Sequence, residues 1–285
     1  MRRALVVSLA LAACDHGLDQ RLAIIDEPRV LAVLHDPAEA KPRDPVTFRA
    51  LIAGPDGPIT APPSWAWCAA PKPPTEDNAV SDACIREDQL LPLGTGATSS
   101  GTLPADGCLR FGPDVPPGTD FRSRDADATG GYYQPLRADV DGLLAFGLVR
   151  IKCSLGRAPV DIAFEYDQRY VLNRHPTLEP FVLERAPANS EVTLRAAWPA
   201  DAAERYVYFD PARQALAVRR EAMRVSWFAT GGSIDVDASA VGEDNSATEV
   251  QTTWHTPDRG TAWIWIVLRD ARGGIATQAH AVTLD

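Results

Sequence analysis

The stretch MRVSWFAT at residues 223–230, followed by Gly231-Gly232, decides the fold. It reads as a β-strand that ends at a glycine turn. Six other segments read as strands of similar length: Pro180–Glu184, Glu191–Trp198, Arg205–Phe209, Glu249–Trp254, Thr261–Arg269 and Ile275–Leu284. Helix caps are nearly absent, apart from a short helical turn expected around Asp210–Val218. About seven short strands at this spacing predict an all-β antiparallel sandwich.

The segment Val225–Gly232 resembles the central strand of bacterial Ig-like and PKD-like domains, in which a tryptophan fills the core before a glycine turn. Three later stretches resemble the final strands of the same families: Trp254–Pro257, Trp263–Val267 and Asp270–Gly274. The resemblance covers about residues 177–285 and implies an Ig-like β-sandwich. This region contains no cysteine, so the resemblance implies that Trp227 holds the core by packing alone.

The N-terminal half repeats this order of strands and turns. Arg29–Leu34, Val46–Ile52, Ser64–Cys68 and Leu143–Cys153 read as strands. In the second of them Val46, Phe48, Ala50 and Ile52 alternate with Thr47, Arg49 and Leu51, which is typical of a half-buried strand. We therefore expect a second sandwich over residues 27–172, in tandem with the first.

Two segments near the middle of the chain are less regular. Val160–Val171 alternates as a strand does, but Ile162, Tyr166 and Tyr170 also recur at helical spacing. We favour the strand. Asn173-Arg174-His175-Pro176 is predicted to be the joint between the two sandwiches, because the residue before a proline is pushed towards extended geometry.

Residues 69–135 are rich in proline, glycine and small polar side chains. This composition predicts a long loop inserted into the first sandwich. A segment with few large apolar residues does not offset its ordering entropy by burial, so we expect disulfides to staple it. As a stapled loop, it is the surface that we expect to contact a partner.

The first fourteen residues carry an export signal. Arg2 and Arg3 precede an uncharged apolar run, Ala4–Ala13, which is shorter than the roughly 20 residues of a membrane-spanning helix. Leu11-Ala12-Ala13-Cys14 resembles a bacterial lipobox. The resemblance implies that residues 1–13 are a cleaved signal peptide and that Cys14 carries a lipid. The alternative is an ordinary signal followed by a chance cysteine.

The lipid on Cys14 implies a membrane-anchored lipoprotein of the cell envelope, either in the outer membrane or on the periplasmic face of the inner membrane. Residues 14–26 are then a tether. Several acyl chains anchor a protein stably, whereas one holds it only reversibly. Cleavage leaves 26 basic and 38 acidic residues, a net charge of −12, which repels anionic lipid and excludes nucleic acid as a partner.

Cysteine parity agrees with export. The chain has five cysteines, and if Cys14 is lipidated, four remain for two disulfides. Of the three pairings we favour Cys84–Cys108, which brackets the loop-like stretch, and Cys68–Cys153, which end strand-like runs. Zinc is disfavoured because no C-x-x-C pair occurs, and a free catalytic thiol is disfavoured by an oxidising compartment.

Two stretches are candidate ligand sites. Asp125, Asp127 and Thr129 imitate the start of a calcium loop, but Leu136 occupies the position of the bidentate glutamate, so an aspartate-rich turn is the favoured interpretation. Tyr132 and Tyr133 could contact a sugar or a partner protein, although packing within the loop is the favoured role. Beyond calcium, no cofactor is expected.

The sequence lacks the common catalytic signatures. There is no G-x-S-x-G, H-E-x-x-H, glycine-rich phosphate loop or S-x-x-K, and the five histidines are scattered. We therefore predict a non-catalytic binding or structural module whose partner is an envelope protein or glycan. The alternatives are an envelope hydrolase with a site built from loops and an accessory subunit of a secretion or surface complex.

Overall fold

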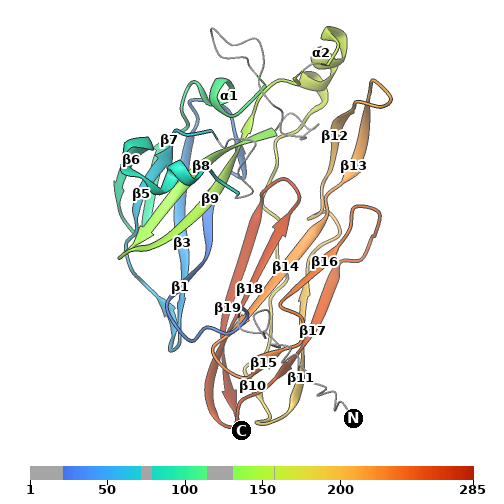
Figure 1. Ribbon diagram of the computed structural model, residues 1–285. Coiled ribbons are helices and arrows are strands. Elements are labelled where there is room, and N and C mark those ends of the chain that lie inside the picture. The colour runs from blue at the N-terminus through green and yellow to red at the C-terminus, as the bar shows by residue number, and fades with distance from the viewer. Residues whose placement is uncertain (1–21, 72–78, 114–130, 157) are drawn as a thin grey trace, which may run out of the picture.

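Two β-sandwiches pack against each other in the computed structural model, which describes residues 22–71, 79–113, 131–156 and 158–285 (Figure 1). The predicted all-β fold, built from antiparallel β-sandwiches, is confirmed. No helix within these described ranges has the length and apolar character needed to cross a membrane.

The first sandwich consists of two sheets packed face to face. One has the strand order β2-β9-β8-β5-β6, and the other has the order β1-β3-β4, with β7 also paired to β3. Its strands are β1 (Arg29–Asp36), β2 (Glu39–Ala40), β3 (Pro45–Gly54), β4 (Gly57–Ile59), β5 (Ser64–Cys68), β6 (Leu90–Thr95), β7 (Thr98–Thr102), β8 (Gly131–Val140) and β9 (Leu143–Lys152). The described residues between these strands also form three short helices: η2 (Asp82–Ile85), η3 (Glu87–Gln89) and α1 (Gly107–Arg110). Phe48, Trp65 and Trp67 pack together in the core, because the alternation predicted for β3 turns Phe48 inward.

The stretch predicted as one long loop, residues 69–135, contains regular structure. β6 pairs with β5, β7 pairs with β3, and β8 begins at Gly131. Proline and glycine in β6 concealed the strand from the sequence, and β6 tolerates them because it lies at a sheet edge, where not every backbone N–H has to be paired.

Val160–Arg169 forms the helix α2, so the prediction of a strand there is wrong. The helical spacing noted in the sequence explains the outcome: Ile162, Tyr166 and Tyr170 pack with Val207 and Phe209 of the neighbouring hairpin. The hairpin consists of β12 (Arg205–Asp210) and β13 (Ala215–Arg220). β13 takes the place of the helical turn that was expected around Asp210–Val218, which is therefore also wrong.

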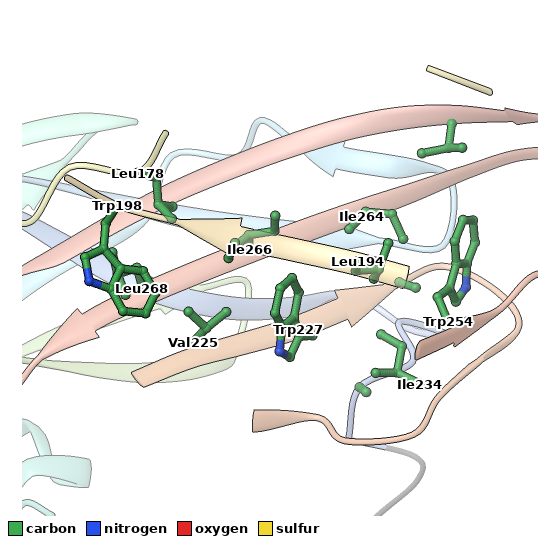
Figure 2. Close-up of a cluster of buried hydrophobic side chains, with 14 of the residues drawn as sticks. Leu178, Leu194, Trp198, Val225, Trp227, Ile234, Trp254, Ile264, Ile266 and Leu268 are labelled. Atoms are coloured by element: carbon green, nitrogen blue, oxygen red, sulfur yellow. The ribbon is translucent and has the colours of Figure 1, made fainter. Parts of the chain in front are cut away.

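The second sandwich consists of a five-stranded sheet, β10-β19-β18-β14-β16, packed on a three-stranded sheet, β11-β17-β15. The strands are β10 (Arg185–Ala186), β11 (Glu191–Ala197), β14 (Met223–Ala229), β15 (Ser233–Ile234), β16 (Ala238–Val241), β17 (Glu249–His255), β18 (Gly260–Asp270) and β19 (Ile275–Leu284). Trp227, Trp254 and Trp198 are fully buried between the sheets (Figure 2). Pro180–Glu184 is not a strand; only Arg185–Ala186 pairs, in parallel, with β19.

The two sandwiches share an apolar seam. Leu34 and Ala32 of β1 contact Val267 of β18. Leu31 contacts Trp265, which lies two residues before Val267 on the same strand. Both faces of β18 are therefore buried, one in its own sandwich and one in the seam, which explains its long apolar run. Trp265 of β18 is fully buried in the seam, and the partly buried Trp263 packs against the same cluster.

Candidate functional site

Buried charge is concentrated where the two sandwiches meet. Arg272, in the turn between β18 and β19, has a side chain only 2% exposed and forms ion pairs with Glu221 at 2.7 Å and Glu204 at 2.8 Å. Its guanidinium also donates to the carbonyl of Val171 and to the hydroxyl of Tyr170. A buried guanidinium requires this many acceptors because an unpaired charge away from water is very costly.

The network continues into the first sandwich. The Tyr170 hydroxyl donates to Oε2 of Glu39 at 2.6 Å, and the guanidinium of Arg150 lies 3.4 Å from Oε1 of the same carboxylate. Glu39 belongs to β2 and Arg150 to β9, which are paired in register. The charges therefore run without a break from β9 of the first sandwich to Glu221 of the second.

The linker between the sandwiches is fixed by the same groups. The backbone N–H of Asn173 donates to Glu39, and its side-chain amide donates to both oxygens of Asp270 at 3.2 Å. Asp270 also accepts from the backbone N–H groups of Arg272 and Gly274. The predicted joint, residues 173–176, is thus bonded to both sandwiches.

Burial perturbs the acidity of this network. Burial raises the pKa of Glu221 to about 7 and raises the pKa of Asp270 and of Tyr170. Such shifts often mark catalytic groups, but here Glu221, Arg272 and Tyr170 are buried and bonded to one another. The network can hold the two sandwiches in one orientation, but it does not present a reactive group to a substrate.

Two histidines lie beside the network. The rings of His35, on β1, and His175, in the linker, are 5.6 Å apart. Nδ1 of His35 bonds the carbonyl of Pro37, so it carries the proton, whereas Nδ1 of His175 accepts from the N–H of Ile275. The two Nε2 atoms are buried without a hydrogen bond within the described structure.

The buried His35 predicts a pH dependence of stability. Burial lowers its pKa from 6.5 to about 4. The unfolded chain then binds the proton more readily, so the stabilisation is complete above pH 6.5 and is lost as the pH falls towards 4. His35→Asn keeps an N–H for Pro37 but does not titrate. Between pH 7 and pH 4 we expect wild type to lose about 3 kcal/mol more than this variant in urea unfolding. Parallel pH curves for the two proteins would contradict the assignment.

The paired tyrosines do not lie on a loop. Tyr132 and Tyr133 are in β8, so the prediction that they lie on an inserted loop is wrong. Tyr132 is buried in the core of the first sandwich, and the Tyr133 hydroxyl accepts from Arg150 at 2.9 Å. The two side chains therefore do not form an exposed aromatic surface for a ligand.

All four cysteines beyond residue 14 form disulfides, but the predicted pairing is wrong. The bridges are Cys68–Cys84 and Cys108–Cys153. The first is short-range because the chain after β5 turns back: Ala69 donates to the carbonyl of Gln89, and β6 then runs along β5. The second fastens α1 to the end of β9.

The lipidation residue Cys14 and the calcium candidates Asp125, Asp127 and Thr129 lie outside the described residues. Within the described residues, no group of three or more His, Cys, Asp or Glu side chains could hold a metal ion. Two acidic residues between β15 and β17 have basic partners. Asp235 lies 2.7 Å from His255, and Glu243 lies 3.5 Å from Arg219.

The pair His255–Asp235 is relevant to the hydrolase hypothesis. It joins adjacent strands β17 and β15, and Ser233 is the cross-strand partner of His255. The histidine and aspartate side chains are 42% and 51% exposed, and Glu191 faces the other ring nitrogen at 3.9 Å. At this exposure water reaches the histidine and both carboxylates, whereas active sites commonly exclude water from the reacting groups.

No protein-family model and no curated protein matches the chain. Similar solved structures include fibronectin(III)-like modules of Clostridium thermocellum CbhA, at 11% identity over 89% of this chain and 94% of that chain, with a TM-score of 0.24. The D0-D1 domain of intimin is 11% identical over 89% and 98% of the chains, with a TM-score of 0.22. The Yersinia pseudotuberculosis adhesin InvE is 10% identical over 88% and 58%, with a TM-score of 0.23. At these values the likeness carries no argument about function.

The sequence analysis did not find the interdomain network. Its members are distant in sequence: Tyr170 and Glu39 are separated by 131 positions, and Arg272 and Tyr170 by 102. One signal was present, because Arg150 interrupts the apolar strand LVRIKC and a charge in such a run requires a buried partner.

Proposed function

We propose that the protein is a lipid-anchored module of the cell envelope that acts by binding or by structural support and not by catalysis. The observation that carries the proposal is the use of the buried charges. Arg272 faces Glu204 and Glu221, and Arg150 faces Glu39, so the residues that could do acid–base chemistry hold one sandwich against the other. A rigid two-domain body is what a binding or structural module requires.

The proposed anchor also orients this body. The N–H of Ile25 donates to the carbonyl of Ala229, and the N–H of Ala229 donates to the carbonyl of Ala23. Ala23 lies nine positions after Cys14, a reach of at most about 32 Å. The end of the second sandwich that carries the C-terminus then lies near the bilayer, and α2 lies at the opposite end (Figure 1).

The two disulfides support an exported location. They use Cys68, Cys84, Cys108 and Cys153 and leave Cys14 outside any described bridge. Disulfides persist in oxidising compartments and are rare in the cytosol. Cys14 is the cysteine that these two bridges do not use, and it is also the residue to which the lipobox resemblance assigns the lipid.

Metabolic labelling tests the anchor. Cells that express wild type are expected to incorporate alkyne-palmitate into the protein, whereas Cys14→Ser abolishes labelling and moves the protein from the membrane to the soluble fraction. Asp15→Asn is the matched control, because it changes the next residue and leaves the thiol. The anchor is wrong if wild type remains unlabelled or if Cys14→Ser is still labelled.

A further inference from the structure

Two arginines face each other on neighbouring strands beside the seam. Arg224 of β14 and Arg269 of β18 are direct cross-strand partners. Val225 and Leu268, which alternate with them, point into the core of the second sandwich, so both arginines project from the opposite face, towards the first sandwich. Like charges that are directly opposite in a sheet are destabilising.

This pair has no counter-charge. Neither the exposed Arg224 nor the half-buried Arg269 forms an ion pair with a carboxylate within the described part of the chain, whereas the buried Arg150 and Arg272 do. Arg269 donates from Nη2 to the carbonyl of Leu31 at 3.2 Å, which leaves most of its five N–H donors free for another acceptor. Burial, and next the charge of Arg224, lower the pKa of Arg269, so its environment lacks a stabilising anion.

The facing sheet adds a third cation. Arg49 of β3 is the cross-strand partner of Leu34, so the two side chains share a face of their sheet. Leu34 packs against Val267, two residues before Arg269 on β18. Arg49 is exposed and also has no carboxylate partner among the described residues. Arg49 therefore lies on the face of the first sandwich that borders the seam.

We propose that Arg224 and Arg269 form a binding site for an oxyanion, a carboxylate or phosphate group, at the open edge of the seam, with Arg49 contributing from the facing sheet. The planar guanidinium fork matches both groups, because each offers two oxygens to parallel N–H donors. Ser226, half-buried on the same face of β14, adds a hydroxyl. The inference rests on the proposed binding role and names the chemistry of its ligand.

Calorimetric titration of the purified full-length protein tests the site. Inorganic phosphate and acetate form separate arms, with sodium chloride holding the ionic strength constant. We expect saturable binding in at least one arm, and a loss of affinity of about tenfold or more in Arg224→Gln. Arg259→Gln is the matched control, because it removes an exposed arginine at the other end of β18 and should bind as wild type does.

A second measurement makes the test independent of affinity. In buffer without oxyanions, Arg224→Gln should melt at a higher temperature than wild type, because it relieves the repulsion on Arg269. Phosphate or acetate should then raise the melting temperature of wild type more than that of the variant. The proposal is overturned by no binding to wild type, by equal loss in Arg224→Gln and Arg259→Gln, or by a variant that melts lower. The labelling of Cys14 reports on the anchor whatever the outcome.

Discussion

Arg272→Met is expected to lower the free energy of unfolding by about 3–5 kcal/mol in urea denaturation. Removing the cation of a buried ion pair leaves its carboxylate partners without a counter-charge and away from water. Glu221 loses its 2.7 Å contact and Glu204 its 2.8 Å contact. Glu221 will respond by binding a proton. Since its pKa is already raised to about 7, the loss of the nearby cation should make the variant more stable at pH 5 than at pH 8 relative to wild type.

Arg174→Met is the matched control for this prediction. Arg174 also pairs with Glu204, at 2.6 Å, but its side chain is 75% exposed. Water screens such a pair, so its removal should change stability far less than the loss of Arg272. If the two substitutions cost the same, the network does not stabilise the joint in the way its geometry implies.

Trp265→Ala is expected to destabilise the protein by about 3–5 kcal/mol, because it opens a cavity in the seam between the sandwiches. Trp265 is fully buried and packs with Ile25, Leu31 and Ala53. Wild type should unfold in one transition, since a large apolar interface couples the two domains. With the seam weakened, calorimetry should resolve two transitions.

Trp265→Phe distinguishes packing from polarity at this position. The indole Nε1 of Trp265 is buried without a hydrogen bond among the described groups. Phenylalanine fills most of the space and removes this unsatisfied donor, so the substitution should cost much less than alanine. A single transition retained in Trp265→Ala would show that the polar network alone couples the sandwiches.

The local patterns in the sequence predicted most of the strands but not their partners. Alternation placed β3, and turn residues bounded β14, β17, β18 and β19, because a strand with one buried face must alternate and a hairpin must turn. The helix α2 was misread as a strand. The twelve residues Val160–Val171 carried both periodicities, and the surface that selected the helix, Val207 and Phe209 of β12, lies some forty positions further on.

The candidate site could not be derived from the sequence for a related reason. Disulfide pairing and the interdomain network both depend on which strands become neighbours, and β2 pairs with β9 across more than one hundred residues. Composition could show that charges such as Arg150 occur within apolar strands, but not that Glu39, Tyr170 and Arg272 meet. The odd cysteine was informative because parity does not depend on the fold.

The two hydrogen bonds between residues 23–25 and Ala229 also determine how the protein responds to a pulling force on its N-terminal segment. Under tension at the N-terminus, force enters the sheet of β14 directly, before it reaches β1 or any part of the first sandwich. The first sandwich and its disulfides are thereby shielded from strain applied at that end. Residues 23–25 also form these hydrogen bonds only after β14, which lies about two hundred positions further along the chain, has been synthesised. The N-terminal segment therefore reaches its native position late.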